Sequence, residues 1–347
     1  MKSGTLLLAA LGLALWTPAA PALTAEKPAG IQWSGKVYTL FEATDEEGEP
    51  ANAFKVNKAR VKASWSDGAM LSAAVQVEFS DIVDTKQKVP LRDAWVKVAP
   101  FQWLGLTMGQ FKKPFSRNEL RGFGKLEFVE RGLGNSFFIE DMLYGGRDVG
   151  AMVSGTLLPT VGLAYYVAAF NGDGQNAKES HSNGAKDLVG RLEVEPLKAL
   201  ALGVSYSAKS FPGDPDKHDP SVLWGADFKA KVPFLRFQGE FLYGENHVVT
   251  SLPKAMAGML AVNSNVKLGK VSGTALKLEP AFRVEFVRPD TELNDADIWA
   301  YTPGLNLLIG KSARLMADLE LVKAGKATDP DYGDATRFML QLAFDLE

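Results

Sequence analysis

The 347-residue sequence has no cysteine, only three histidines and no excess of basic residues. The missing thiols exclude disulfide scaffolds, thiolate metal sites and cysteine nucleophiles. His181, His218 and His247 show none of the spacings typical of a metal or catalytic site. A formal net charge of -3 argues against a basic protein that binds nucleic acid. We therefore expect no enzyme, no cofactor, no bound metal and no nucleic-acid partner.

Long apolar runs are also missing, because no stretch beyond residue 30 could form a membrane-spanning helix of about 20 residues. The one apolar run, Leu6 to Trp16, follows the basic Lys2 and precedes small residues and prolines. This order resembles a secretory signal peptide covering residues 1–25, with cleavage after Ala22 or Ala25; the alternative is an uncleaved anchor. Residues 26–347 would then form one exported domain, either a soluble β-protein or a β-barrel in a membrane.

The stretch "FKVNKARVKASWSDGAMLSAAVQVEF", from Phe54 to Phe79, alternates polar and apolar residues with a period of two. Lys58, Arg60 and Lys62 share one parity, while Val61 and Trp65 share the other, which is typical of a strand with two different faces. Charges of both signs recur opposite aromatic residues in later segments. A charged side chain at mid-depth on a lipid face would cost about 2–4 kcal/mol, so we expect the charges to face a watery lumen.

Sixteen segments of this kind follow one another along the chain, and short and long connections alternate between them. A soluble sandwich has no reason to keep that alternation, whereas an outer-membrane barrel has short periplasmic turns and long external loops. The prediction is an all-β fold, a transmembrane antiparallel barrel of about sixteen strands, with both termini at the periplasmic rim. The expected strands lie near 31–42, 53–65, 69–80, 90–99, 103–112, 147–156, 161–170, 186–196, 199–209, 220–231, 233–244, 255–267, 277–288, 295–308, 312–323 and 335–346.

The third long connection, residues 113–146, is too long to lack structure of its own. Ser116 and Glu119 have capping-box spacing and predict the start of a short helix. We expect this loop to fold into the lumen and narrow it; the alternative is a solvated external flap with paired charges. Its five basic and five acidic residues predict no selectivity by their sum, so selectivity depends on which charges face the pore.

Six segments, in order, are similar to the phosphate-selective porin O/P family of bacterial outer-membrane channels. They are "FKVNKARVKASW", "VPLRDAWVKV", "LTMGQFKKPFSRNEL", "VERGL", "GGRDVGAMVSG" and "YYVAAFNGDGQN". The resemblance implies a sixteen-stranded barrel, a homotrimer and a narrow anion-conducting zone. By matching position it assigns Arg60, Asp93 and Arg131 to that zone, with Arg121 and Lys125 from the loop. The full set of expected pore-lining residues is Lys58, Arg60, Lys62, Asp93, Lys113, Arg117, Arg121, Lys125, Arg131 and Arg147.

The resulting functional expectation is a passive outer-membrane porin that prefers anions, with phosphate or other small solutes as cargo and membrane lipid around it. Where the phosphate channels of the family carry adjacent arginines in the second strand, this chain has Lys58-Ala59-Arg60, and its loop lacks their serine pair. Phosphate specificity is thus left open by the sequence. The alternatives are a plugged, non-conducting barrel with a structural or adhesive role and a soluble exported β-protein that binds ligands.

Overall fold

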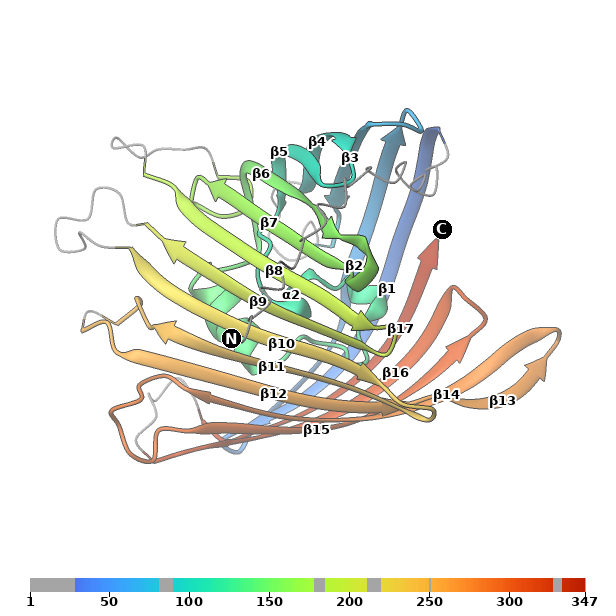
Figure 1. The fold of residues 1–347 in the computed structure, drawn as a ribbon. Coiled ribbons are helices and arrows are strands. Elements are labelled where there is room, and N and C mark those ends of the chain that lie inside the picture. The colour runs from blue at the N-terminus through green and yellow to red at the C-terminus, as the bar shows by residue number, and fades with distance from the viewer. Residues whose placement is uncertain are drawn as a thin grey trace, which may run out of the picture.

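A computed structural model describes residues 29–80, 90–177, 185–210, 220–249, 251–326 and 333–346. The expected signal peptide, residues 1–25, lies outside these ranges. The described chain forms one antiparallel sheet that curls into a barrel (Figure 1). No helix in these ranges is long and apolar enough to cross a membrane.

Seventeen strands follow one another along the chain, each paired with its neighbours. In chain order they are β1 (Gly30–Glu46), β2 (Glu49–Ser66), β3 (Leu71–Glu78), β4 (Leu91–Phe101), β5 (Leu104–Lys112), β6 (Arg147–Leu158), β7 (Leu163–Phe170), β8 (Asp187–Leu197), β9 (Leu200–Lys209), β10 (Ser221–Lys231), β11 (Leu235–Glu245), β12 (Lys254–Ser264), β13 (Val266–Val271), β14 (Thr274–Arg288), β15 (Ile298–Ile309), β16 (Ala313–Ala324) and β17 (Ala335–Leu346). The short helical turns are α2 (Arg117–Leu120), η1 (Phe123–Lys125), α3 (Leu133–Asn135), η2 (Ser136–Asp141) and η3 (Pro159–Val161).

The barrel wall contains sixteen strands because β12 and β13 occupy one position. Both pair with β14, β12 from Met256 to Asn263 and β13 from Val266 to Val271, so they are two halves of a strand interrupted at Asn265. The first and last strands pair along most of their length, from Gly35 opposite Leu346 to Glu46 opposite Ala335, which closes the barrel. The prediction of a closed barrel of about sixteen strands is confirmed.

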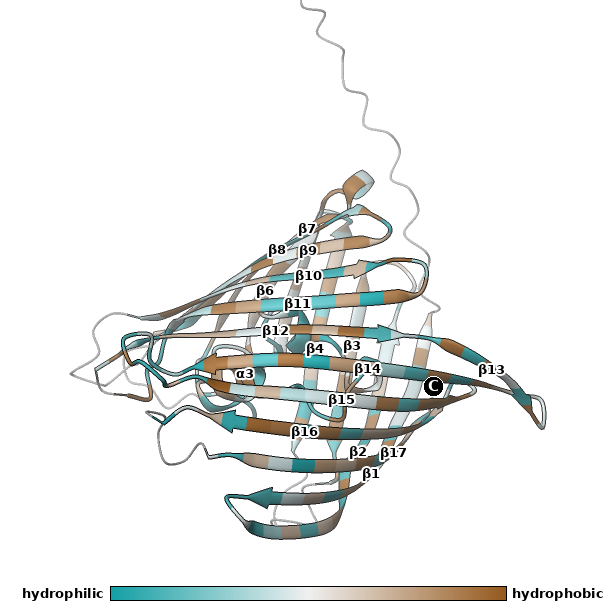
Figure 2. Ribbon diagram, turned by 90° about the horizontal axis from the view of Figure 1, so that it is seen from below, coloured by the Kyte–Doolittle hydropathy of each residue, from teal (hydrophilic) through white to brown (hydrophobic). Residues whose placement is uncertain are grey.

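The two faces of the wall differ as the alternation predicts. In β3, Gln76 and Glu78 are 9% and 2% exposed, whereas Val75, which precedes Gln76, is 51% exposed. Glu78 contacts Arg60 of β2, and the outward side chains of β2 include Val61 and Trp65. Figure 2 shows hydrophilic and hydrophobic residues alternating along the strands of the barrel wall. The apolar outer face meets lipid, and the charged face lines the interior.

One expected connection is wrong. The expected strands 31–42 and 53–65 leave a polar connection that includes Thr44 to Asn52, predicted as one of the long external loops, but β1 and β2 continue through it and are joined at Glu47 and Gly48. Both turn residues have positive φ, 54° and 91°, as tight hairpin turns require. The strands extend beyond the apolar band to a level where both faces meet water, so the apolar alternation that marks a membrane strand is lost there.

Candidate functional site

The connection between β5 and β6, residues 113–146, lies inside the barrel; we call it loop L3. It carries α2, η1, α3 and η2. Ser116 caps α2, since its Oγ accepts a hydrogen bond of 3.0 Å from the backbone N–H of Glu119, and the expected short helix is confirmed. The Glu119 carboxylate pairs with Lys112 Nζ at 3.0 Å and Arg131 Nε at 3.2 Å. Glu119 thereby ties the start of L3 to its later part.

L3 is fixed to the wall at β8, β10 and β11. The Ser116 hydroxyl donates to the Glu240 carboxylate at 2.7 Å. The Arg117 guanidinium reaches Glu193 of β8 and Asp227 of β10, each at 2.6 Å. These charge-assisted contacts are stronger than hydrogen bonds between neutral groups, and they hold α2 against this side of the lumen.

The next part of L3 is fixed to the wall at β14, β15 and β16. Wall side chains donate to its backbone carbonyls: Arg314 to Leu126 at 2.8 Å, Asn306 to Glu127 at 2.8 Å and Arg283 to Glu130 at 2.8 Å. L3 therefore reaches different parts of the wall from inside the barrel. The prediction that it folds into the lumen is confirmed, and the external flap is wrong.

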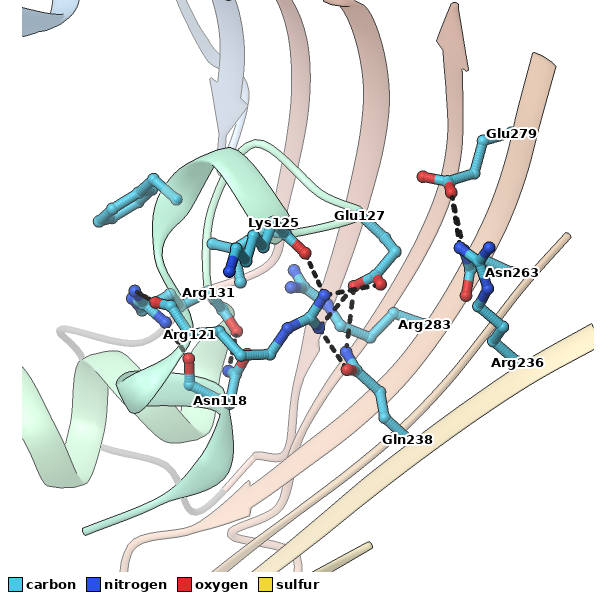
Figure 3. A network of polar contacts seen from close by, with 12 residues as sticks. Asn118, Arg121, Lys125, Glu127, Arg131, Arg236, Gln238, Asn263, Glu279 and Arg283 are labelled. Carbon is cyan, nitrogen blue, oxygen red and sulfur yellow. Dashed lines mark hydrogen bonds and ion pairs between the residues drawn. The ribbon is translucent and has the colours of Figure 1, made fainter. Parts of the chain in front are cut away.

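Arg121 and Glu127 form the polar centre of L3. The Arg121 guanidinium contacts both carboxylate oxygens of Glu127 at 2.7 Å, and it also bonds to Gln238 of β11 (Figure 3). The bidentate geometry fixes both side chains and joins L3 to the wall. Further along this side, Arg236 lies 3.6 Å from Glu279.

The residues at the base of L3 form a buried apolar core, and the side chain of Lys113 is buried next to this core. Phe115, Phe138 and Tyr144 of L3 pack with wall residues such as Phe170 in the largest apolar cluster of the described chain. The Lys113 ammonium has no exposed surface and lies 2.7 Å from Asp187 and 3.3 Å from Asp148. These contacts make Lys113 an anchor of the loop base and remove its charge from the lumen surface.

Replacing Lys113 with methionine should destabilise the folded barrel by about 3 kcal/mol. Removing one partner of a buried ion pair typically costs 3–5 kcal/mol because the remaining charge is uncompensated. We expect a destabilisation at the lower end of this range, because Lys209 lies 3.5 Å from Asp187 and offsets part of the charge of Asp187. The temperature at which the folded band converts to the unfolded band in detergent gels would measure the effect. The exposed Lys125→Met is the matched control, and equal conversion temperatures for the two variants would contradict the assignment.

Three of the expected pore-lining residues meet around one ring. Lys58 Nζ, the Arg60 guanidinium and the Arg131 guanidinium lie 4.7, 5.3 and 4.6 Å from the centroid of Phe123, in η1. Two come from β2 and one from L3, so the ring marks the place where the loop meets this wall. Cations near an aromatic face are stabilised by its quadrupole, which helps to keep three like charges together.

The basic residues of this region differ in whether they form ion pairs. Arg60 forms an ion pair with Glu78, and Arg147 lies 2.8 Å from Asp93. Lys58 donates to the amide oxygen of Asn57 at 2.7 Å and has no ion-pair partner among the described residues. Its charge is consequently available to a solute.

Arg92 is a functional candidate that sequence reasoning missed. It follows Leu91 on a strand whose alternation assigns it to the lipid face. The β3–β4 register shifts at this point, where Gln76 faces Asp93 but Val77 faces Leu91, so Arg92 is the extra residue of a β-bulge. Its charge interacts with those of Arg60 and Arg147, which places the guanidinium on the lumen side. In the described part of the chain it forms no ion pair, and its Nε is buried without a hydrogen bond.

The remaining expected residues are distributed along the lumen. Lys62 lies on the same inward face of β2 as Lys58 and Arg60. It is closer than they are to the short turn that follows β2. Arg121 and Lys125 line a cavity on the side of L3 that faces the short turns, and Arg117 is held at the wall away from Phe123. The structure thus brings together Lys58, Arg60 and Arg131, with Asp93, Arg147 and Arg92 beside them. We call the six cations Lys58, Arg60, Arg92, Lys112, Arg131 and Arg147, together with Phe123, the basic cluster.

A closed sixteen-stranded barrel with an apolar outer band, a charged interior and an inward-folded third loop defines a porin. Solved porins share this fold. The anion-selective porin from Comamonas acidovorans aligns with a TM-score of 0.66 and 11% identity over 91% of this chain and 99% of that chain. OmpF of Salmonella typhi, in complex with daunomycin, aligns at 0.63 with 10% identity over 91% and 97%. The channel DcaP of Acinetobacter baumannii aligns at 0.61 with 13% identity over 90% and 97%.

The protein family is identified by a match between the amino-acid sequence and a family model. Residues 31–221, more than half of the chain, match the family model of phosphate-selective porin O and P, and the chain belongs to this family. No curated protein sequence matches it. The protein is accordingly an outer-membrane diffusion channel for small solutes and not an enzyme.

Proposed function

We propose that the channel prefers anions, phosphate among them, and that the basic cluster sets this preference. The observation that carries the proposal is the charge balance. The six cations of the cluster face five neighbouring carboxylates, Glu78, Asp93, Glu119, Glu130 and Glu140, so the local net charge is 6 − 5 = +1. A narrowing with net positive charge attracts anions and repels cations. Arginine also suits phosphate because its planar fork bonds two oxygens at once.

Planar-bilayer recordings of the folded protein in a salt gradient would test the proposal. We expect discrete conductance steps, a reversal potential of the sign for anion selectivity, and a current that falls as phosphate is added. Steps with a cation-selective potential would overturn the preference. Absence of steps from folded, inserted protein would favour the closed barrel with a structural or adhesive role.

The protomer is further proposed to assemble as a homotrimer. OmpT of Vibrio cholerae, solved in a trimer form, aligns with a TM-score of 0.56 and 13% identity over 92% of this chain and 100% of that chain. Chemical cross-linking in native membranes should then give bands at two and three times the protomer mass, and a single protomer band would oppose the assembly.

Lowering the pH should strengthen the anion preference through Glu140. Burial raises the pKa of Glu140 above its ordinary 4.5, and the carboxylates of Glu119 and Glu130 raise it further, against a lowering by Arg131. A raised pKa means that Glu140 gains its proton at a higher pH than an ordinary glutamate, which removes a negative charge near the cluster. Reversal potentials measured between pH 7 and pH 4.5 should therefore move in the anion-selective direction. Glu140→Gln should lose part of this shift, and an unchanged pH profile in that variant would contradict the assignment.

A further inference from the structure

Two large cavities of the described barrel lie one on each side of the middle of L3. The inner chamber, of about 500 Å³, is lined by Arg121, Gly124, Lys125, Leu126 and Glu127 of L3, and by wall residues beside short turns, such as Lys231 and Lys311. The outer chamber, of about 460 Å³, is lined by L3 residues 130–133, 136 and 140, and by wall residues nearer the other rim, such as Glu46 and Arg337. Adjacent stretches of one loop thus line two compartments of similar size.

The inner chamber is basic. Its lining contains seven cationic side chains and three carboxylates, a balance of 7 − 3 = +4. Lys125, Lys229, Lys231 and Lys311 form no ion pair within the part of the chain that the structure describes. The cations are Arg121, Lys125, Lys229, Lys231, Arg236, Lys311 and Arg314, and the carboxylates are Glu127, Glu279 and Asp345.

The outer chamber is acidic. Its lining contains five carboxylates and three cations, a balance of 3 − 5 = -2. Glu42 and Glu320 share Arg337 and have further partners in Lys55 and Arg283, whereas Glu130 and Glu140 form no ion pair among the described residues. The carboxylates are Glu42, Glu46, Glu130, Glu140 and Glu320, and the cations are Lys55, Arg131 and Arg337.

A fixed partition lies between the two chambers. Val129 of L3 packs on three inward-facing apolar side chains, Leu40 of β1, Met316 of β16 and Met339 of β17. The backbone N–H of Val129 also donates to Asp318 at 2.6 Å. Apolar side chains are unexpected on the charged inner face of a porin wall, and here they hold L3 at the boundary between the chambers. The separation of charge is therefore set by packed and hydrogen-bonded groups.

We propose that these chambers act in series as regions of opposite sign and make the channel rectify current. The inference rests on the proposed channel function. Anions carry most of the current in a positive region and cations in a negative one. When the external side is positive, anions enter through the inner chamber and cations through the outer chamber, so both accumulate at the partition. When the external side is negative, both leave the partition, ions are depleted there, and the conductance falls.

Bilayer recordings of the full-length folded protein at about 0.05 M and 1 M potassium chloride test this directly. The current ratio at opposite voltages should be about two or more at low salt and close to one at 1 M, where the screening length is about 3 Å. Because the chain has no cysteine, Asn294→Cys in the external connection between β14 and β15 can report orientation. A membrane-impermeant thiol reagent added on one side then identifies the external face.

Two independent sets of variants separate the contributions of the chambers. Lys229→Gln/Lys231→Gln/Lys311→Gln lowers the inner balance from +4 to +1, and Glu130→Gln/Glu140→Gln raises the outer balance from -2 to zero. Each set should weaken rectification while channels still open. The matched control, Lys198→Gln/Lys267→Gln/Lys270→Gln, removes three lysines that line neither chamber.

The outcomes distinguish the two proposals. No conductance from folded protein would defeat the channel function itself. Conductance with equal currents at both polarities in low salt, or rectification that both chamber variants leave unchanged, would overturn the two-chamber inference and leave the channel intact. A current that is larger when the external side is negative would also overturn it.

Discussion

Reversing the charges of Lys58 and Arg92 should turn an anion-preferring channel into a cation-preferring one. These two cations of the basic cluster form no ion pair with any described residue, in contrast to Arg60 and Arg147. Lys58→Glu/Arg92→Glu changes the local balance from 6 − 5 = +1 to 4 − 7 = -3. The reversal potential in a salt gradient should change sign.

Substituting Lys58 and Arg92 tests selectivity more directly than substituting an arginine that forms an ion pair, such as Arg60. Arg60→Ala would leave Glu78 buried without its partner and would mix a folding defect with a change in selectivity. Lys58→Gln/Arg92→Gln, with a local balance of 4 − 5 = -1, covers the case in which two new carboxylates prevent folding; it should remove the anion preference. Lys198→Glu/Lys270→Glu makes the same change in total charge away from the basic cluster. If this control and the cluster variant shift the potential equally, the cluster does not set selectivity.

Removing the middle of L3 should raise the single-channel conductance by about two-fold or more, since a sixteen-stranded barrel without an obstruction encloses a wide aqueous channel. The excision can be made where the loop narrows. Asn118 Nδ2 donates to the Arg131 carbonyl at 2.8 Å, so residues 119–130 can be replaced by two glycines without separating these ends. The variant keeps the dry base of L3, including Phe115 and Tyr144, and thus the largest apolar cluster.

The same variant should reduce rectification, because the partition formed by Val129 is removed with residues 119–130. Shortening the external connection between Asp290 and Ala296 is the matched control, as it removes loop residues that line neither chamber. Its conductance should equal that of the unmodified protein. If the excision in L3 also left conductance unchanged, the narrowest part of the pore would lie elsewhere.

Alternation of residues along the chain predicts the strands well because each strand separates lipid from a charged interior. The alternation fails to predict the structure where a strand extends beyond the lipid, and where a β-bulge interrupts the two-residue period. The hairpin at Glu47 and Gly48 lies beyond the apolar band, and Arg92 changes face at a bulge that depends on pairing with β3. A second bulge, where Tyr38 faces Lys58 but Thr39 faces Val56, likewise depends on the partner strand.

The environment of a charged residue in L3 is harder still to predict. Lys113 looks like any other basic residue of the loop, yet Asp187, which makes it an anchor, is 74 positions away in the sequence. The position of Phe123 between Lys58 and Arg131 likewise depends on how the loop folds back onto β2. Motif similarity places Arg60 and Arg131 in one zone, but only the three-dimensional arrangement shows which charges are already neutralised.

The seam between β1 and β17 constrains the order in which the barrel can assemble. It joins residues at opposite ends of the chain; Lys36 and Asp345, 309 positions apart, lie 2.5 Å from one another. Contacts of such separation are slow to form, because the entropy of closing the chain is lost before the contact stabilises it. Until the seam forms, both edge strands would expose backbone groups to lipid at several kcal/mol each. Insertion into the bilayer and closure must therefore be coupled, because β17 supplies the sheet edge on which β1 closes.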